Sequence, residues 1–294
     1  MKAAVQNLVR NYSIETTVMQ AQRVARFADL VATGTHVYIP HTPHTNFDEA
    51  VALAARLRRE GMEPVPHIVA RRIENEPALE TLLSRLTSEA GVRQALIVAG
   101  DMAKPAGSLY NTLQILESGL LEKYKVQSIG VAGHPEGHPS VGDAVLRDAL
   151  RRKNDYAFNT GANVYVVTQF TFSADPVIAW EKSHGSDIGA LSITAGLPGL
   201  ATARTLLKYA MECGVGASLK AFSKRYASIT RLLTVSTPGD IIVGMARYKH
   251  STPKSRLSGV HFFTFGGFQP TAEWANKIVE GNFEMTEDGG LVII

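Results

Sequence analysis

Eight polar side chains lie at or just after the ends of short β-rich runs, where groups that do chemistry are often placed. They are Glu15, His41, His67, Asp101, His134, Glu136, His138 and Gln169. Carboxyl and imidazole groups can transfer protons, and an amide can donate and accept hydrogen bonds at once. A carboxylate at the end of a barrel strand also loses hydration unless it is paired or used. On this argument we expect Glu15 and Asp101 to be functional carboxylates.

Two of the histidine-containing segments allow more than one interpretation. His67 alternates with apolar neighbours in Val65–Val69, so a core histidine bonded to a carbonyl is the alternative to a functional one. The turn His134–Pro139 holds two histidines, a glutamate, two prolines and a glycine. Those ligand types allow a metal, but the prolines fix the backbone and favour a shaped cradle for an organic ligand. We predict no metal site.

The elements that must position these groups are short strands alternating with helical patterns along the whole chain. This alternation is typical of parallel βα units. An open doubly wound sheet is the alternative, but it normally has a glycine-rich turn after its first strand, and Thr16-Thr17-Val18 is not one. We predict a (β/α)₈ barrel forming one domain over residues 1–294. The eight predicted strands are Tyr12–Thr16, Thr35–Pro40, Glu63–Val69, Gln94–Gly100, Ser128–Gly133, Asn163–Phe170, Ala190–Gly196 and Val260–Phe265.

The helical patterns have the apolar spacing of one buried face. The clearest are Phe47–Arg59, Ala78–Glu89 and Leu109–Leu121. Asn46 with Glu49 predicts a capping box before the first of them, and Gly34, Gly61 and Gly91 fall where helices end and left-handed geometry favours glycine.

Two segments exceed what a barrel needs. Ser218–His250 predicts extra helices before the eighth strand, split at Pro238-Gly239, which could form a lid or a dimer surface. The apolar end Leu291–Ile294 is expected to pack on a partner chain or on the barrel floor.

Composition excludes several classes of protein. The formal charge is only +3 and there is no basic block, so a nucleic-acid partner is not expected. The chain has one cysteine, Cys213, which we interpret as a packing residue and which rules out an intrachain disulfide. There is no signal-peptide pattern and no apolar run long enough to span a membrane. We expect a soluble, cytoplasmic protein that forms a homo-oligomer.

Taken together, these segments resemble the methylenetetrahydrofolate reductase family over nearly the whole chain. The residues that carry the resemblance are Ile129–Pro139, Gly161-Ala162-Asn163 leading to Thr168-Gln169-Phe170, Pro66-His67-Ile68, Gly100-Asp101 and His261-Phe262-Phe263-Thr264. The resemblance implies a barrel enzyme that reduces 5,10-methylenetetrahydrofolate to 5-methyltetrahydrofolate. It further implies that Glu15, in Ser13-Ile14-Glu15, is the general acid that opens the methylene bridge. Asp101 would stabilise the iminium cation, and Gln169 and Phe172 would bind the folate.

The resemblance also implies a cofactor site. His67, Gly100, Tyr110, His134 and His138 fall where the family lines its FAD, with NADH or NADPH as reductant.

The sequence departs from the family at three places where charges are expected. Ala99 precedes Gly100-Asp101 instead of arginine, Tyr156-Ala157 stands where a basic pair is expected, and Gly266-Gly267 replaces Asn-Arg. Such charges anchor a pyrophosphate. Two alternatives therefore stay open: a flavin-independent reductase with direct NAD(P)H-to-folate transfer, and a non-redox folate-binding protein that partners a methyltransferase.

Overall fold

The chain forms a closed barrel of eight parallel strands. The computed structural model describes residues 1–294 except 44, 213–218, 221, 224–234 and 288. Around the barrel the strand order is β1-β10-β7-β6-β5-β4-β3-β2, so neighbours in the chain are neighbours in the sheet. The strands are β1 (Ser13–Glu15), β2 (His36–Ile39), β3 (Glu63–Val69), β4 (Gln94–Val98), β5 (Ser128–Gly133), β6 (Asn163–Phe170), β7 (Ser192–Pro198) and β10 (Leu257–Phe263). The predicted (β/α)₈ barrel is confirmed, and the open sheet is wrong.

The local sequence pattern predicted the ends of some strands correctly and of others not. β3, β5 and β6 have the predicted bounds, whereas β7 and β10 are displaced from theirs. These two strands pair in parallel from Leu257 opposite Ile193 to Phe263 opposite Pro198. Their ends therefore depend on a partner distant in the sequence and not on local composition.

Helices follow the strands along the chain. They are α1 (Lys2–Val9), α2 (Val18–Ala21), α3 (Phe47–Arg59), α4 (Glu76–Ala90), α5 (Thr112–Leu116), α6 (Leu120–Lys123), α7 (Asp143–Thr160), α8 (Asp175–Ser183), α9 (Gly185–Ile188), α10 (Ala203–Glu212), α13 (Gly239–Ser251) and α14 (Phe268–Glu280), with 3₁₀ turns η1 (Phe27–Asp29) and η2 (Ala70–Arg72). The capping box before α3 is confirmed, since the Glu49 amide donates to Asn46 Oδ1 at 2.8 Å. Gly34, Gly61 and Gly91 all have positive φ, as predicted.

The single helix predicted over Leu109–Leu121 is wrong. Asn111 caps α5 by accepting from the Gln114 amide at 3.0 Å, which starts that helix at Thr112, three residues after Leu109. Gly119, with φ of 72°, then separates α5 from α6. Both features stop a continuous helix because a capping residue and a left-handed residue lie outside helical geometry.

The chain packs as two compact units, each made of separate chain segments. The first unit comprises Met1–Ile14, Gly133–Asp148 and Val167–Ile294, and the second comprises Glu15–Ala132 and Ala149–Val166.

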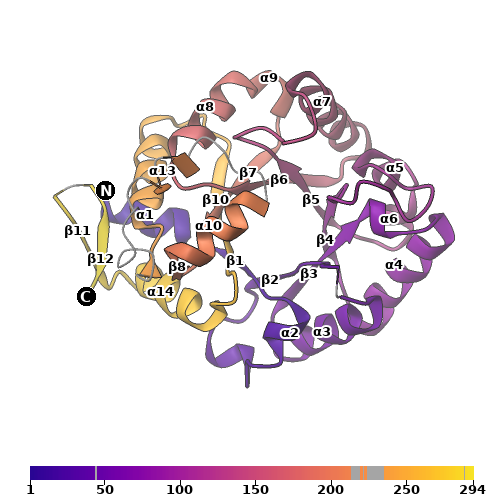
Figure 1. Cartoon of the computed structure of the whole chain (residues 1–294), viewed down its shortest axis with the longest axis horizontal. Coiled ribbons are helices and arrows are strands. Elements are labelled where there is room, and N and C mark those ends of the chain that lie inside the picture. The colour runs from indigo at the N-terminus through magenta and orange to yellow at the C-terminus, as the bar shows by residue number, and fades with distance from the viewer. Residues whose placement is uncertain (44, 213–218, 221, 224–234, 288) are drawn as a thin grey trace. The chain divides into compact units, whose positions relative to one another are not determined.

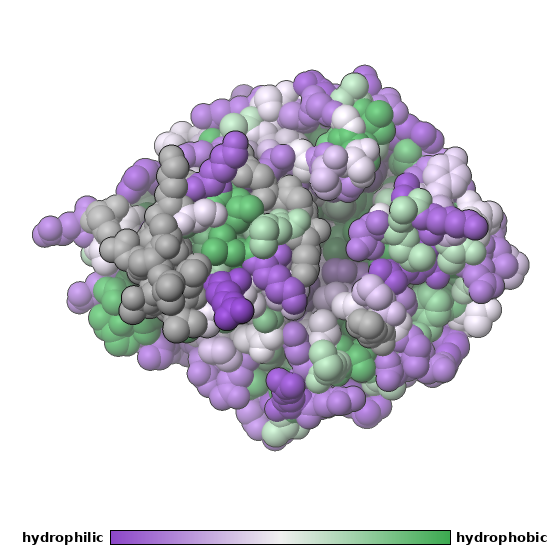
Figure 2. All heavy atoms as spheres, viewed as in Figure 1, coloured by the Kyte–Doolittle hydropathy of each residue, from purple (hydrophilic) through white to green (hydrophobic). Residues whose placement is uncertain are grey.

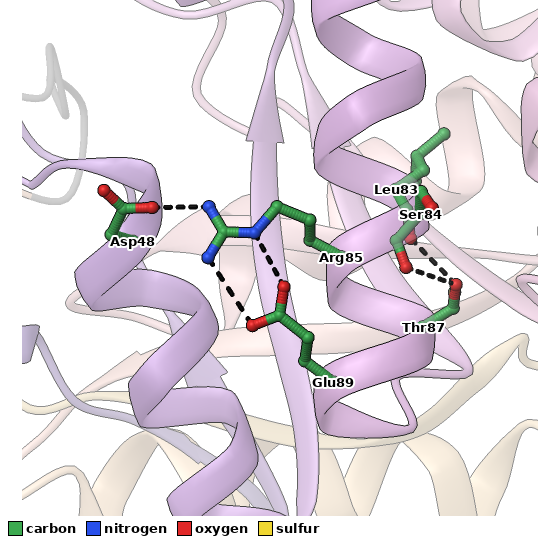
Figure 3. A network of polar contacts seen from close by, with 6 residues as sticks. All are labelled: Asp48, Leu83, Ser84, Arg85, Thr87 and Glu89. Carbon is green, nitrogen blue, oxygen red and sulfur yellow. Dashed lines mark hydrogen bonds and ion pairs between the residues drawn. The ribbon is translucent and has the colours of Figure 1, made fainter.

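In the second unit, β2, β3, β4 and β5 pair in parallel, and α3 packs against α4 outside them (Figure 1). Figure 3 shows how charge links these two helices. Arg85 of α4 reaches Asp48 at the start of α3 and also holds Glu89 of its own helix, with 2.7 Å between Nε and Oε1. On the same helix the Thr87 hydroxyl donates back to the carbonyls of Leu83 and Ser84.

In the first unit, β1 pairs with β10 and β10 with β7, and α1 packs against α13 and α14. The chain end adds a hairpin of β11 (Phe283–Met285) and β12 (Leu291–Ile293), which packs through β12 on α13 and α14 and lies beside the N-terminus in Figure 1. Leu291 is buried there, whereas Val292 and Ile294 are exposed. The apolar end is thus partly covered by the chain itself.

The predicted extra segment is confirmed only in its second half. The helix expected after Pro238 is α13, whereas much of Ser218–Thr234, and Cys213 with it, lies outside the described residues. One feature was not predicted: β8 (Ala201–Thr202), which directly precedes α10, pairs antiparallel with β9 (Val235–Ser236), which lies just before Pro238 and α13.

Hydrophilic residues cover most of the face in Figure 2, interrupted by small hydrophobic patches. Among the described residues, no helix is long and apolar enough to cross a membrane. The cytoplasmic location and the homo-oligomer stay predictions.

Candidate active site

Glu15 is the last residue of β1 and belongs to the second unit. The Thr16 amide donates to the Tyr38 carbonyl at 3.0 Å, which holds the end of β1 beside β2. The Glu15 side chain is half-buried. Burial raises the pKa of its carboxyl to about 8, because the ionised form is the one that loses hydration. Glu15 is therefore mainly protonated at neutral pH and can act as an acid.

An imidazole and two phenols meet in the same unit. His67 of β3 is half-buried, and its ring lies edge-on to Tyr38 with 6.0 Å between centroids. The Tyr38 hydroxyl lies 2.8 Å from the hydroxyl of Tyr165 on β6. Burial raises the pKa of Tyr165, so its hydroxyl stays protonated across the physiological range. The two tyrosines were not identified from the sequence, although both lie within predicted strands.

Asp101 differs from Glu15 in its surroundings. β4 ends at Val98, and Gly100 turns the chain with a φ of 95°, in a place where any Cβ would collide with Val69. The Asp101 side chain that follows is 85% exposed and lies 3.4 Å from the guanidinium of Arg72. The desolvation argument made for Asp101 is wrong, because its carboxylate remains hydrated. Its role in the site stays a prediction.

The loop that carries Asp101 is held by Arg71. Arg71 Nη1 donates to the Met102 carbonyl at 2.7 Å, and its Nε donates to the Tyr110 carbonyl at 3.0 Å. The Tyr110 side chain itself is 52% exposed. The Ala106 amide donates to the Arg71 carbonyl at 2.8 Å, so both ends and the middle of the loop are fixed to one residue.

The close approach of this loop to the backbone at Glu74 predicts a strong effect at Gly107. A Cβ at this position would overlap the Glu74 carbonyl, so Gly107→Ala should displace the loop and lower the free energy of unfolding by roughly 1–3 kcal/mol. Urea denaturation would measure the loss. Gly142→Ala is the matched control, since no atom lies within 4 Å of a Cβ there. Equal stability of the two variants would contradict the packing described.

The turn after β5 belongs to the first unit. The rings of His134 and His138 meet edge-to-face with 5.3 Å between centroids. Glu136 Oε1 accepts from the Thr171 hydroxyl at 3.0 Å, which joins the turn to the end of β6. The Ser140 amide donates to His138 Nδ1 at 3.2 Å. Within the described part of the chain, no group of three or more His, Cys, Asp or Glu side chains is placed to hold a metal ion.

Gln169 and Phe172 lie at the end of β6. Gln169 Oε1 is buried and accepts no hydrogen bond from any described residue. A buried amide oxygen in this state costs free energy unless a ligand donates to it. Phe172 stacks on Phe222 with 4.1 Å between centroids. The surrounding aromatic cluster also contains Phe170, Tyr209, Phe263 and Phe265.

The first-strand motif is supported from the eighth strand. The β1–β10 register sets Ser13 opposite His261, and Ser13 Oγ lies 2.9 Å from His261 Nδ1. Burial lowers the pKa of His261 to about 3, so this histidine is neutral. The first-strand motif is therefore in direct contact with His261, which belongs to a segment that carries the family resemblance.

Three residues of α7 upstream of β6, namely Arg152, Lys153 and Tyr156, are already engaged. Arg152 pairs with Glu117 at 2.6 Å, and the Tyr156 hydroxyl donates to Glu122. Lys153 is buried with its Nζ 3.3 Å from the Ala132 carbonyl. Burial lowers the pKa of Lys153 to about 8.

Sequence reasoning missed Arg71, Arg72 and the buried position of Lys153. The two arginines directly follow β3 at its carboxyl end, so the rule that selected Glu15 and Asp101 would also have selected them. Lys153 gave no such signal, because its burial depends on the packing of α7.

These strand ends define the class of the protein: a (β/α)₈ barrel with acidic, imidazole and amide side chains at the carboxyl ends, where barrels of this fold bind their ligands. The chain belongs to the methylenetetrahydrofolate reductase family, whose model, described as "Methylenetetrahydrofolate reductase", matches residues 10–265.

A solved structure shows the same fold. It is a protein from Clostridium thermocellum described as binding two copies of 5-methyl-5,6,7,8-tetrahydrofolic acid. The TM-score is 0.57 at 11% sequence identity, and the match covers 95% of this chain and 99% of that one.

Proposed function

We propose that the protein catalyses hydride transfer between NAD(P)H and 5,10-methylenetetrahydrofolate to give 5-methyltetrahydrofolate. The observation that carries this proposal is Glu15, a carboxyl at a barrel strand end that burial keeps protonated near neutral pH. Membership of the reductase family supports the substrate class. The Clostridium thermocellum protein of the same fold, which binds methyltetrahydrofolate, supports it independently.

The proposed role of Glu15 follows from the chemistry of the bridge. The five-membered ring is a poor hydride acceptor until N10 is protonated and leaves, which produces a 5-iminium cation. Glu15 supplies that proton and becomes a carboxylate. A hydride from the reduced nicotinamide then adds two electrons to the methylene carbon and gives the 5-methyl group. Overall, one NAD(P)H and one proton are consumed for each folate reduced, and Glu15 regains its proton from solvent.

Gln169 and Asp101 are proposed to hold the folate. The unpartnered Gln169 Oε1 suits an N–H donor on the edge of a pterin, while the amide nitrogen can donate to a ring nitrogen. The exposed carboxylate of Asp101 can move toward the iminium cation and stabilise its charge. Phe172 offers an aromatic face for the folate.

FAD is the cofactor that the family implies, through His67, Gly100, Tyr110, His134 and His138. Its pyrophosphate needs cationic donors. Among the described residues upstream of β6, Arg152 forms an ion pair with Glu117, and the Tyr156 hydroxyl donates to Glu122. Lys153 donates to the backbone carbonyl of Ala132 inside the fold. These three residues leave no free cation where the family anchors the FAD pyrophosphate, and Arg72 after β3 is the guanidinium that keeps donors for an anion. We propose direct transfer from NADH or NADPH, with no step through flavin, and the visible spectrum of the purified protein distinguishes the two.

The function is tested by adding methylenetetrahydrofolate to the purified protein with NADH or NADPH and following absorbance at about 340 nm. Folate-dependent oxidation without flavin bands near 375 and 450 nm is the expected result. Flavin bands in the spectrum of the active protein would show that the enzyme uses FAD as its hydride carrier. Binding of methyltetrahydrofolate without turnover in either direction would identify the non-redox folate-binding protein instead, and absence of both binding and turnover would reject a folate function.

Gln169→Leu is expected to weaken methyltetrahydrofolate binding by roughly 10- to 100-fold, because the pterin loses an acceptor in a buried place. The variant should be at least as stable as the natural protein, since it removes a buried oxygen that no described residue pairs. Calorimetry and thermal unfolding measure the two effects. Gln127→Leu, at an exposed position, is the control. Unchanged folate affinity in Gln169→Leu would remove Gln169 from the site.

A further inference from the structure

Arg72 is a half-buried arginine with few partners. It ends η2, directly after β3, and its side chain is only 14% exposed. Among the described residues its one ion-pair partner is Asp101, through a single Nη2–Oδ1 contact of 3.4 Å. A guanidinium carries five N–H donors, and the Arg72 nitrogens that have no partner among the described residues remain accessible to solvent. Most of the donors of Arg72 are thus available to another group.

Arg71, the residue before Arg72, has a structural role. Arg71 donates to the carbonyls of Met102 and Tyr110 at 2.7 and 3.0 Å, both ordinary hydrogen-bond lengths. Arg72 has no comparable bond to the described backbone. Its partner Asp101 is 85% exposed and therefore hydrated, so the pair contributes little to stability.

The positive charge of Arg72 also acts on a neighbouring histidine. His41 follows β2, and its pKa falls to about 4, first because of burial and second because of the nearby charge of Arg72. Arg72 is thus near enough to His41 to disfavour protonation of the imidazole. His41 is neutral at physiological pH and can donate one hydrogen bond beside the guanidinium.

His41, Arg72 and Asp101 follow three neighbouring strands of the second unit at their carboxyl ends. We propose that Arg72, assisted by His41, forms a subsite that binds an anionic group of the ligand, a carboxylate or a phosphate, and that this anion replaces Asp101 as the partner of Arg72. A guanidinium binds either oxyanion with two parallel hydrogen bonds. Release from Arg72 also leaves Asp101 free to face a cation.

This inference rests on the proposed function for the identity of the ligand. Two reactants of that function carry suitable anions: the folate has the carboxylates of its glutamate, and the nicotinamide dinucleotide has phosphates. The two sources are separable, because 5-methyltetrahydropteroate has the pterin and the aminobenzoate but no glutamate.

The test compares the natural protein with Arg72→Met and Arg72→Lys by calorimetry. Arg72→Met should weaken the binding of the ligand that supplies the anion by roughly 10- to 100-fold. Arg72→Lys should weaken this binding less, because the positive charge remains. Weaker binding of methyltetrahydrofolate but not of the pteroate assigns the subsite to the glutamate. Weaker binding of NADH or NADPH assigns it to phosphate. Arg59→Met, which removes an exposed arginine on α3, is the matched control.

Dissociation constants within twofold of the natural protein for every ligand, in an Arg72 variant with unchanged circular dichroism, would overturn the subsite. If the natural protein binds neither folate nor dinucleotide, the proposed function fails, and inorganic pyrophosphate and glutarate then test Arg72 alone. Thermal stabilisation by either anion that Arg72→Met or Arg72→Lys loses would support the subsite. Equal stabilisation of natural and variant protein, or none in either, would overturn it.

Discussion

Replacing Glu15 by glutamine is expected to lower kcat for folate reduction by roughly 10²- to 10⁴-fold, the usual contribution of a general acid. Glutamine keeps the shape and one donor group of the protonated carboxyl but cannot release a proton. The dissociation constant for methyltetrahydrofolate should stay within a few-fold, because that product needs no proton from Glu15. Single-turnover oxidation of NAD(P)H and calorimetry measure the two quantities.

Glu76→Gln, on the exposed first turn of α4, is the control for the loss of a carboxyl elsewhere in the second unit. A Glu15→Gln protein with near-natural kcat would remove Glu15 from the mechanism. Loss of folate binding together with loss of turnover would instead make Glu15 a binding residue.

The same substitution should stabilise the fold at neutral and alkaline pH. The pKa of Glu15 is raised from 4.5 to about 8, so between these values the native state holds a proton that the unfolded chain has released. Stability from this group is fully present below pH 4.5 and is lost as pH rises through 8. Glutamine does not titrate, so Glu15→Gln should gain roughly 4 kcal/mol at pH 8 relative to pH 4.5. Urea unfolding at both pH values would show it, and a difference independent of pH would contradict the raised pKa.

The second large effect is expected in the pH dependence of the natural protein. Only the protonated form of Glu15 can open the bridge, so kcat/KM should be constant below pH 7 and fall about tenfold per pH unit above 8. The loss from the plateau below pH 7 to pH 10 would reach roughly a hundredfold. His41 and His261 are held neutral by their lowered pKa values, of about 4 and about 3, and add no transition in this range.

Steady-state rates in buffers of constant ionic strength would test this profile. The alkaline decline should be absent from the residual activity of Glu15→Gln, which separates it from changes in the substrate. A rate that rises above pH 8, or one that is flat to pH 10, would mean that the ionised carboxylate or another group does the work.

Much of the fold was predictable because its signals are local. The bounds of β3, β5 and β6 follow from short β-rich runs, and the capping box of Asn46 and Glu49 spans three residues. Local signals failed where two of them competed. The apolar spacing of Leu109–Leu121 indicated one helix, but the cap at Asn111 and the left-handed Gly119 divided it.

The sequence by itself determined the barrel, the family, and the strand ends that carry Glu15 and Gln169, since hydrophobic period and motif order are written along the chain. Only the tertiary structure decided how those side chains are charged and paired. Glu15 and Asp101 were equivalent carboxylates in the sequence, yet one is desolvated and holds a proton near neutral pH while the other lies in water beside Arg72, a partner 29 residues away. The pKa of a carboxyl depends on the desolvation and ion pairing caused by all the atoms that folding brings close to it. A local sequence pattern does not contain that information.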